Sequence, residues 1–186
     1  MKKIMLAVVA VAMSIVANAA SIKWSCPNGV ADATEEGITS ATMAYLIDSS
    51  VMSQEALYTA LVGGATISAA VEGKTVKSVG LNDGGFSTQT FSAFNGGDRV
   101  SLYMVCFDES LNAVYFSEEI NKAISGTGAT SFSFSANSSI ETIAADMSGF
   151  STANGGWVST AAVREPTSGL LLLLGMAGLA LKRKQA

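Results

Sequence analysis

The sequence predicts a mainly β protein, a small β-sandwich of jelly-roll or Ig-like type with one short helix, placed between two apolar terminal segments. Three observations carry this prediction. Strand-like runs alternate with Gly and Asn turn signals through the middle of the chain. One stretch instead has apolar residues at helical spacing. Each end holds an uncharged apolar run with cations beside it, which predicts an N-terminal signal helix and a C-terminal transmembrane helix.

Composition excludes several kinds of chemistry. The 186 residues include no histidine, which removes the commonest general base and the commonest metal ligand. Most of the cations lie near the two ends: Lys2, Lys3, Arg164, Lys182, Arg183 and Lys184. Residues 20–163 therefore carry five cations and fourteen acids, a net charge of −9. Nucleic-acid binding needs clustered Lys and Arg, so we expect no nucleic-acid partner.

The first residues have the three parts of a secretory signal peptide. A lysine pair forms the charged start, and residues 4–16 form an apolar run of 13 residues. Ala17 and Ala19 supply the small-x-small pattern that signal peptidase recognises. We therefore expect residues 1–19 to be removed, which leaves Ala20 as the mature N-terminus.

The segment that follows contains a strand, a helix and a second strand. Residues 42–48 are apolar β-formers that end at a turn. Ser53 starts the stretch with helical spacing, which Gly63 and Gly64 stop. Residues 74–81 then alternate apolar and polar side chains, as a strand with one buried face does.

The clearest β signal lies in the centre of the chain. A run punctuated by phenylalanine, residues 86–94, is followed by a turn cluster at 95–98. Residues 100–107 are apolar on both faces, which predicts an inner strand. Residues 113–119 follow a short turn and are expected to be its hairpin partner.

A last strand and the end of the domain come next. Residues 130–136 alternate strictly, with Phe132 and Phe134 expected to point inward. A Gly/Ser/Asn-rich stretch then leads toward a linker. We expect the secreted β-rich domain to span residues 20–158 and the linker to span 159–163.

Two cysteines, Cys26 and Cys106, are available for a disulfide. An exported chain meets an oxidising compartment, where such a bond persists. Closing a loop of about 80 residues would stabilise the fold by roughly 4–5 kcal/mol in the chain-entropy description. The alternative is that Cys106, inside an apolar run, is a small core residue with an unmodified thiol.

No catalytic or metal-binding constellation emerges. The acids beside glycine at 83–85 and 95–98 lack the ligand spacing of an EF-hand, so tight turns are expected, with a structural calcium ion as the alternative. Adjacent acids such as Glu118 and Glu119 point to opposite faces of a strand and cannot form a local catalytic pair. We therefore expect a non-enzymatic protein without a metal or cofactor.

The C-terminal run is a short candidate for a transmembrane helix. Residues 167–181 carry no charge over 15 positions, which is about 22 Å of helix. The hydrocarbon core of a bilayer is about 30 Å thick. Lys182, Arg183 and Lys184 follow as a basic tail within residues 182–186, which stops transfer and stays on the cytoplasmic side.

The Glu165-Pro166 pair, the short Leu/Gly/Ala-rich helix and the basic end resemble a PEP-CTERM sorting domain. Arg164 stands where the family motif has its first proline. The resemblance covers residues 164–186 and implies a substrate of an exosortase, a membrane enzyme that recognises the motif and cuts near it. It also implies a Gram-negative bacterium, transient anchoring in the inner membrane, and a destination at the cell surface or in the extracellular matrix. Exopolysaccharide is a further partner in such a setting.

Two other interpretations stay open. One is a plain membrane anchor with the same topology and no cutting. The other is a secreted carbohydrate-binding module or glycan-active enzyme held by such an anchor. Six aromatic side chains are candidates for stacking on a sugar: Trp24, Tyr45, Tyr58, Tyr103, Tyr115 and Trp157. We expect most of them to pack in the core instead.

Overall fold

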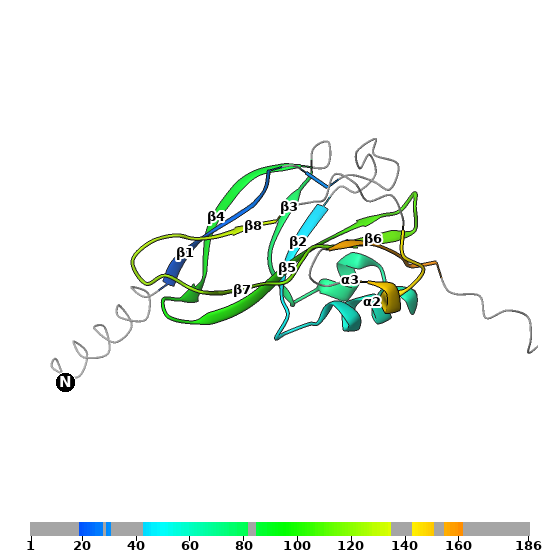
Figure 1. The fold of residues 1–186 in the computed structure, drawn as a ribbon, viewed down its shortest axis with the longest axis horizontal. Coiled ribbons are helices and arrows are strands. Elements are labelled where there is room, and N and C mark those ends of the chain that lie inside the picture. The colour runs from blue at the N-terminus through cyan, green and yellow to red at the C-terminus, as the bar shows by residue number, and fades with distance from the viewer. Residues whose placement is uncertain are drawn as a thin grey trace, which may run out of the picture.

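The computed structural model describes six stretches of the chain: residues 19–27, 29–30, 43–81, 85–134, 143–150 and 155–161. They form two β-sheets with two α-helices beside them (Figure 1). This confirms the prediction of a mainly β protein, and the arrangement of the sheets is consistent with a β-sandwich. The expected signal helix and C-terminal transmembrane helix lie outside the described residues. Within those residues, no helix is both long and apolar enough to cross a membrane.

The smaller sheet has three strands in the order β4-β1-β8. Its central strand is β1 (Ala19–Cys26), which runs antiparallel to β4 (Phe86–Asn95) and parallel to β8 (Thr130–Ser133). Phe132 and Phe134 are both fully buried, as the strict alternation predicted. The first described strand is thus the middle of a sheet.

The larger sheet is built around β5 (Arg99–Asp108). In order, the strands are β3 (Thr75–Gly80), β2 (Met43–Asp48), β5, β6 (Ala113–Phe116) and β9 (Gly156–Ser159), and β7 (Ile120–Ala123) pairs with β5. All these pairs are antiparallel. The predicted hairpin between β5 and β6 is confirmed, and β5 is an inner strand with buried residues on both faces.

The turn at residues 95–98 carries the chain from the smaller sheet to the larger one. Asp98 Oδ2 accepts a hydrogen bond from the Asn95 backbone N–H at 2.9 Å. Gly97 has a φ of 96°, a backbone conformation that favours glycine. The acid and the glycines are therefore explained by the tight turn that the sequence predicted.

A break separates β6 from β7 along one edge of β5. β6 pairs with the C-terminal half of β5 and β7 with its N-terminal half. At the break, the Ser117 hydroxyl accepts a hydrogen bond from the Met104 N–H at 2.7 Å, and the Ser117 N–H donates to the Met104 carbonyl at 2.9 Å. The strand predicted at 113–119 therefore ends at Phe116, because a side chain replaces a backbone group in the pairing.

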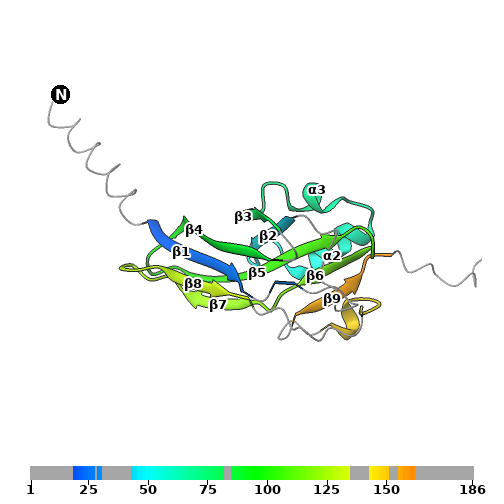
Figure 2. The same cartoon turned by 90° about the horizontal axis from the view of Figure 1, so that it is seen from above.

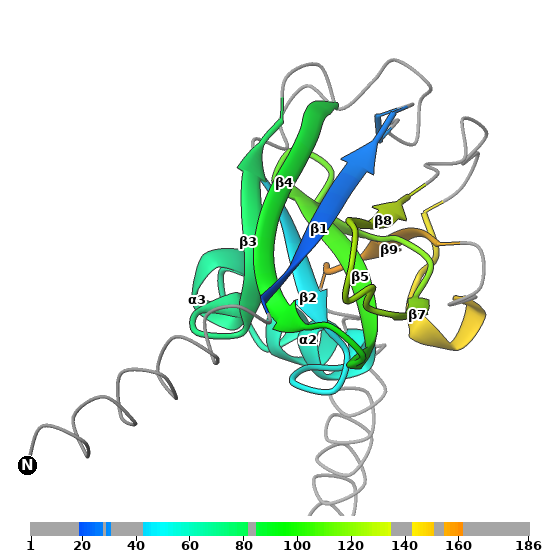
Figure 3. The ribbon, with the colours of Figure 1, turned by 90° about the vertical axis from the view of Figure 1, so that its left-hand side faces the viewer.

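Side chains between the two sheets form the inner core. Figure 3 shows β1 and β4 in front of β2 and β5. Buried residues of these strands belong to one core cluster. Its largest members are Trp24, Tyr115, Phe132, Phe134 and Trp157, all fully or almost fully buried. Burying a large apolar side chain contributes roughly 1.5–3 kcal/mol, so this layer contributes substantially to stability.

A helical layer covers the other face of the larger sheet. The predicted helix is α2 (Gln54–Val62), with the Ser53 hydroxyl accepting a hydrogen bond from the Ala56 N–H and Gly63 at its C-terminal end. A second helix, α3 (Ile67–Val71), was not predicted, so the expectation of one short helix is wrong. Its five residues are too few to produce a helical period in the sequence.

The outer core lies between the larger sheet and this helical layer. It contains Leu57 and Leu61 of α2, Val71 of α3, and Tyr103 and Phe116 of the sheet. The 3₁₀ helix η1 (Met147–Gly149), drawn in gold in Figure 2, lies near β9 on the same face. The central strands of the larger sheet therefore contribute buried side chains to a core on each side.

Candidate functional site

The structure describes only some of the residues that the sequence singled out. Ala17, the motif at 164–166 and the basic tail at 182–184 lie outside the described residues. Ala19 is the first residue of β1 and pairs with Asn95. Cleavage after Ala19 would thus remove one residue from β1 and leave the rest of its register in place.

Cys26 and Cys106 lie in the same inner core, one on each sheet. Cys26 Sγ is 3.4 Å from the Gly29 carbonyl oxygen, to which its S–H donates. Burial, then the Cys26 sulfur, then the Asp108 carboxylate raise the pKa of the Cys106 thiol. The structure does not join the two sulfurs, so the disulfide stays a prediction.

Most of the aromatic candidates for sugar stacking are core residues, as expected. Trp24, Tyr103, Tyr115 and Trp157 are at most 1% exposed. Tyr115 and Trp157 pack edge to face, with ring centroids 5.6 Å apart. Neither tryptophan presents a face on which a sugar ring can stack.

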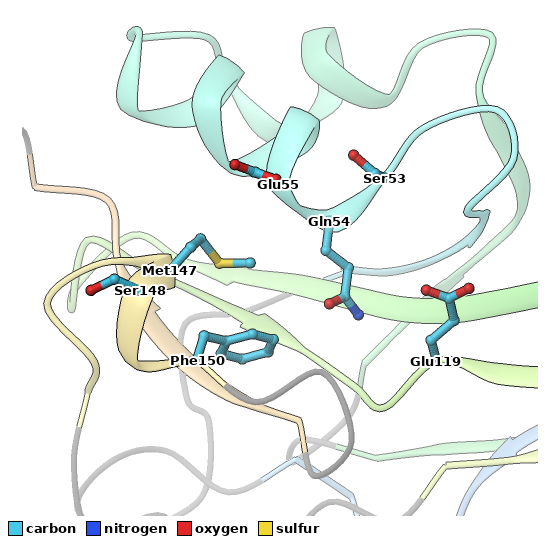
Figure 4. A pocket seen from close by; sticks show the side chains of 7 residues that line it. All are labelled: Ser53, Gln54, Glu55, Glu119, Met147, Ser148 and Phe150. Atoms are coloured by element: carbon cyan, nitrogen blue, oxygen red, sulfur yellow. The ribbon is translucent and has the colours of Figure 1, made fainter.

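A surface pocket of about 480 Å³ lies where the helical layer meets the β6–β7 break (Figure 4). Three segments line it: the start of α2, the residue before β7, and the segment that contains η1. The lining residues are Ser53, Gln54, Glu55, Glu119, Met147, Ser148 and Phe150. Because these residues are distant in sequence, the pocket exists only in the folded chain.

Gln54 forms the floor of this pocket. Its side chain is only 4% exposed and points from α2 toward the strands, with Met147 and Phe150 on one side and Glu119 on the other (Figure 4). Its Nε2 donates a hydrogen bond to the Ser117 carbonyl at 2.9 Å. That bond fixes the amide orientation, because a carbonyl can only accept. Gln54 Oε1 then accepts no hydrogen bond from any described residue.

Such a buried acceptor without a donor is costly, by about 1–3 kcal/mol. Most buried polar groups in native proteins have a partner in the protein or in ordered water. The exceptions therefore need an explanation, and at Gln54 the oxygen belongs to a residue that lines a pocket. A donor held in the pocket, either an ordered water or a ligand, would satisfy this oxygen.

Glu119 forms one side of the pocket. Ser49 donates a hydrogen bond from its hydroxyl to Glu119 Oε1 at 2.7 Å. Burial raises the pKa of Tyr103, and the negative charge of the Glu119 carboxylate raises it further. Tyr103 stays protonated and donates to the Met52 carbonyl at 3.0 Å.

The segment 143–150 forms the opposite side and is attached to the sheet at two places. Ala144 pairs with Val158 of β9, donating to the Trp157 carbonyl at 2.9 Å and accepting from the Ser159 N–H at 2.8 Å. The Phe150 ring packs edge to face on Phe116 at 5.8 Å. These contacts hold Met147 and Phe150 over the pocket.

The pocket presents acceptors, two carboxylates and apolar surface, and its lining includes no cation. The Ser53 hydroxyl accepts from the Ala56 N–H as the cap of α2, and the Ser148 hydroxyl donates to Asp146 Oδ1. This set of groups suits the binding of a hydrogen-bond donor. Among the described residues, no group of three or more Cys, Asp or Glu is placed to hold a metal ion.

Comparison with known proteins gives no match for this chain among family models, curated proteins or solved structures.

Sequence reasoning did not find the pocket. Gln54 occupies the first turn of a helix, where a polar residue is normally exposed. Phe150 lies in the Gly/Ser/Asn-rich stretch 148–157, which the sequence indicated as the approach to a linker, and Met147 directly precedes that stretch. The only local signal was the adjacent pair Glu118 and Glu119, which gave no information about what lay opposite.

Proposed function

We propose that this chain is a non-enzymatic exported protein that an exosortase sorts to the cell surface or extracellular matrix. The observation that carries the proposal is the order of features at the C-terminus: the motif at 164–166, the uncharged run at 167–181 and the basic tail at 182–184. They follow a domain preceded by signal-peptide features at residues 1–19. The protein is the substrate of the sorting enzyme and meets signal peptidase and the inner membrane on the way.

Two features support this proposal, one in the described domain and one in the sequence. β9 ends at Ser159, so residues 160–163 separate the last described strand from Arg164. That spacing allows an enzyme to act on Glu165-Pro166 without breaking the pairing of β9. Proline is also disfavoured inside an α-helix, so the presence of Pro166 in the motif is compatible with recognition by a protease-like site.

Both tryptophans are buried, so neither offers an aromatic face for stacking on a sugar. This supports a protein sorted to the cell surface over one that recognises sugars. The alternative, a carbohydrate-binding module or glycan-active enzyme on a plain anchor, needs exposed rings or a cleft that pairs carboxylates. A glycan array probed with the purified chain separates these functions. Saturable binding of a neutral oligosaccharide would favour the alternative.

The sorting proposal is tested by the mature C-terminus of the protein. The chain is expressed in a host with its exosortase and in a matched strain without it, and intact masses are measured. We expect loss of a C-terminal segment that includes residues 170–186 only where the exosortase is present. The double variant Glu165→Ala/Pro166→Ala should keep its tail, whereas Thr167→Ala, one position further on, should be processed normally. Retention of the tail in both strains would favour a plain anchor.

A further inference from the structure

The pocket of Figure 4 carries chemistry that sorting does not use. We propose that it binds a primary ammonium group carried on a small apolar or ring-shaped scaffold, with Gln54 Oε1 and the Glu119 carboxylate as acceptors. This inference concerns the folded domain alone and does not depend on how the tail is processed.

The amide oxygen of Gln54 at the floor of the pocket has no partner among the described residues, which supports a ligand with a hydrogen-bond donor. The Gln54 amide is held by its bond to the Ser117 carbonyl, so its oxygen cannot turn away to find another donor. Because Gln54 lines the pocket, the pocket is the route by which a donor would reach this oxygen. The volume of about 480 Å³ is far larger than the roughly 30 Å³ that one water occupies, and it has room for a small molecule.

The negative charge of the pocket lining favours a cationic ligand. Glu55 and Glu119 line the pocket, and no lysine or arginine does. A neutral donor would satisfy Gln54 but would leave both carboxylates without a counter-charge. An ammonium group carries a positive charge and three N–H donors, so it can donate to the Gln54 oxygen and to Glu119, while the exposed Glu55 adds to the negative charge around the pocket.

The N-terminus of α2, in contrast, favours an anion over a cation. A helix N-terminus carries about half a positive charge and favours anions. Here the Ser53 hydroxyl already accepts from the Ala56 N–H, and Glu55 lies in the first turn of the helix. Two full negative charges outweigh this half charge, so the pocket as a whole selects a cation.

Met147 and Phe150 form an apolar side of the pocket. Phe150 offers a ring, against which a cation gains a favourable electrostatic contact. Met147 is unbranched and flexible, so it can adjust to let an N–H reach the buried amide oxygen. A ligand with an apolar body beside its ammonium group uses both side chains.

Calorimetric titration of the purified full chain in mild detergent tests the proposal. The probes are n-butylammonium, n-butanol as its neutral counterpart, glucosamine, and N-acetylglucosamine as the neutral counterpart of glucosamine. We expect saturable binding of at least one of the two ammonium probes and weaker binding of its neutral counterpart. Binding of glucosamine identifies an amino sugar as a source of the group, whereas binding of n-butylammonium alone identifies an alkyl amine such as a lysine side chain.

Variants locate the binding. Glu119→Gln keeps the shape and an acceptor oxygen but removes the charge, and it should weaken binding of the ammonium probe by about 10- to 100-fold. Glu72→Gln makes the same change of net charge at an exposed position on the end of α3, outside the pocket, and should have no effect. Gln54→Met removes the acceptor and should weaken binding at least as much.

Circular dichroism of Gln54→Met is needed, because the variant also loses the bond to Ser117. If it does not fold, the comparison of Glu119→Gln with Glu72→Gln decides the question. Equal loss in those two variants, equal binding of neutral and charged probes, or no binding of either ammonium probe would overturn the proposal. None of these outcomes bears on whether the tail is cleaved.

Discussion

At the scale of single residues, the inner core contains polar atoms that burial leaves without partners. The buried Tyr115 hydroxyl has no hydrogen-bond partner among the described residues, and the buried Trp24 Nε1–H has none there either. Tyr103, in contrast, donates to the Met52 carbonyl. The two tyrosines lie on opposite sides of the larger sheet and differ only in whether the hydroxyl is satisfied.

We predict that Tyr115→Phe is neutral or stabilising, because it removes a buried group that has no partner. Tyr103→Phe removes a satisfied hydroxyl and should lower the free energy of unfolding by about 1 kcal/mol. Urea unfolding of both variants measures the difference. A loss at Tyr115 as large as that at Tyr103 would show that the Tyr115 hydroxyl has a donor or acceptor after all.

The same tyrosines predict how stability depends on pH. Burial raises the pKa of Tyr103 and of Tyr115 above the ordinary value of 10.0, and the nearby acidic groups raise it further. Above about pH 10 the unfolded chain then releases protons that the folded chain keeps, so the free energy of unfolding falls as pH rises. Below that pH this contribution is complete.

Alkaline titration checks this expectation. Tyrosinate absorbance of the two buried rings should increase only together with the loss of near-ultraviolet circular dichroism. If the absorbance of all four tyrosines increases while the protein is still folded, the burial argument is wrong.

The two cysteines provide a separate prediction. An exchange with an external disulfide-bearing oxidoreductase would oxidise both thiols, form one S–S bond between Cys26 and Cys106, and reduce the donor disulfide to two thiols. Intact mass after alkylation of the unfolded, unreduced chain counts the thiols. We expect none on exported protein. Reduction should then lower the free energy of unfolding by roughly 4–5 kcal/mol. Two alkylated thiols on exported protein would contradict the disulfide.

At the scale of elements, α2 begins where a local signal places it. The Ser53 hydroxyl accepts from the Ala56 N–H at 3.1 Å. Ser53→Ala should therefore lower the free energy of unfolding by about 1 kcal/mol, whereas Ser53→Asp keeps the cap and should cost little. Urea unfolding compares the two variants, and equal stability of Ser53→Ala and wild type would show that the cap contributes nothing.

The turn at 95–98 depends on a glycine for another reason. A Cβ on Gly96 would overlap the Cα of Gly126, so the two backbones are in close contact. Gly96→Ala should lower the free energy of unfolding by about 1–3 kcal/mol through this overlap. Gly128→Ala is the matched control, because its Cβ would meet only Ser125 Oγ at 3.9 Å. Thermal unfolding that ranks the control as the more damaging change would contradict this account.

These elements show what sequence can and cannot predict. β5 and α2 were predictable because each contains its own signal, the run 100–107 that is largely apolar on both faces in one and a capped helical period in the other. β7 and β9 have four residues each and become strands only because β5 and β6 offer them an edge. The pocket was unpredictable for the same reason, since Gln54 and Phe150 meet only through tertiary pairing.

At the scale of the whole molecule, β5 connects the two cores. Leu102 and Met104 belong to the inner core, whereas Tyr103 and Val105 belong to the outer one. A strand that is shared in this way should make the two cores unfold together. Two-state unfolding is also the rule for domains of this size.

We therefore predict one cooperative transition. Fluorescence of Trp24 and Trp157 reports on the inner core, and far-ultraviolet circular dichroism includes the signal of α2 and α3. Both should change at the same urea concentration. An earlier loss of the helical signal would mean that the helical layer unfolds separately.

The parallel pairing of β1 with β8 has a consequence for the order of folding. Ile22 pairs with Thr130, so the first strand to be synthesised waits for one made roughly a hundred residues later. Until then the smaller sheet lacks one of its edges and the inner core cannot close. Contacts of such large sequence separation form slowly, and we expect a nascent chain to stay open for most of its synthesis. A chain that threads through a narrow channel before it folds is well served by such a delay.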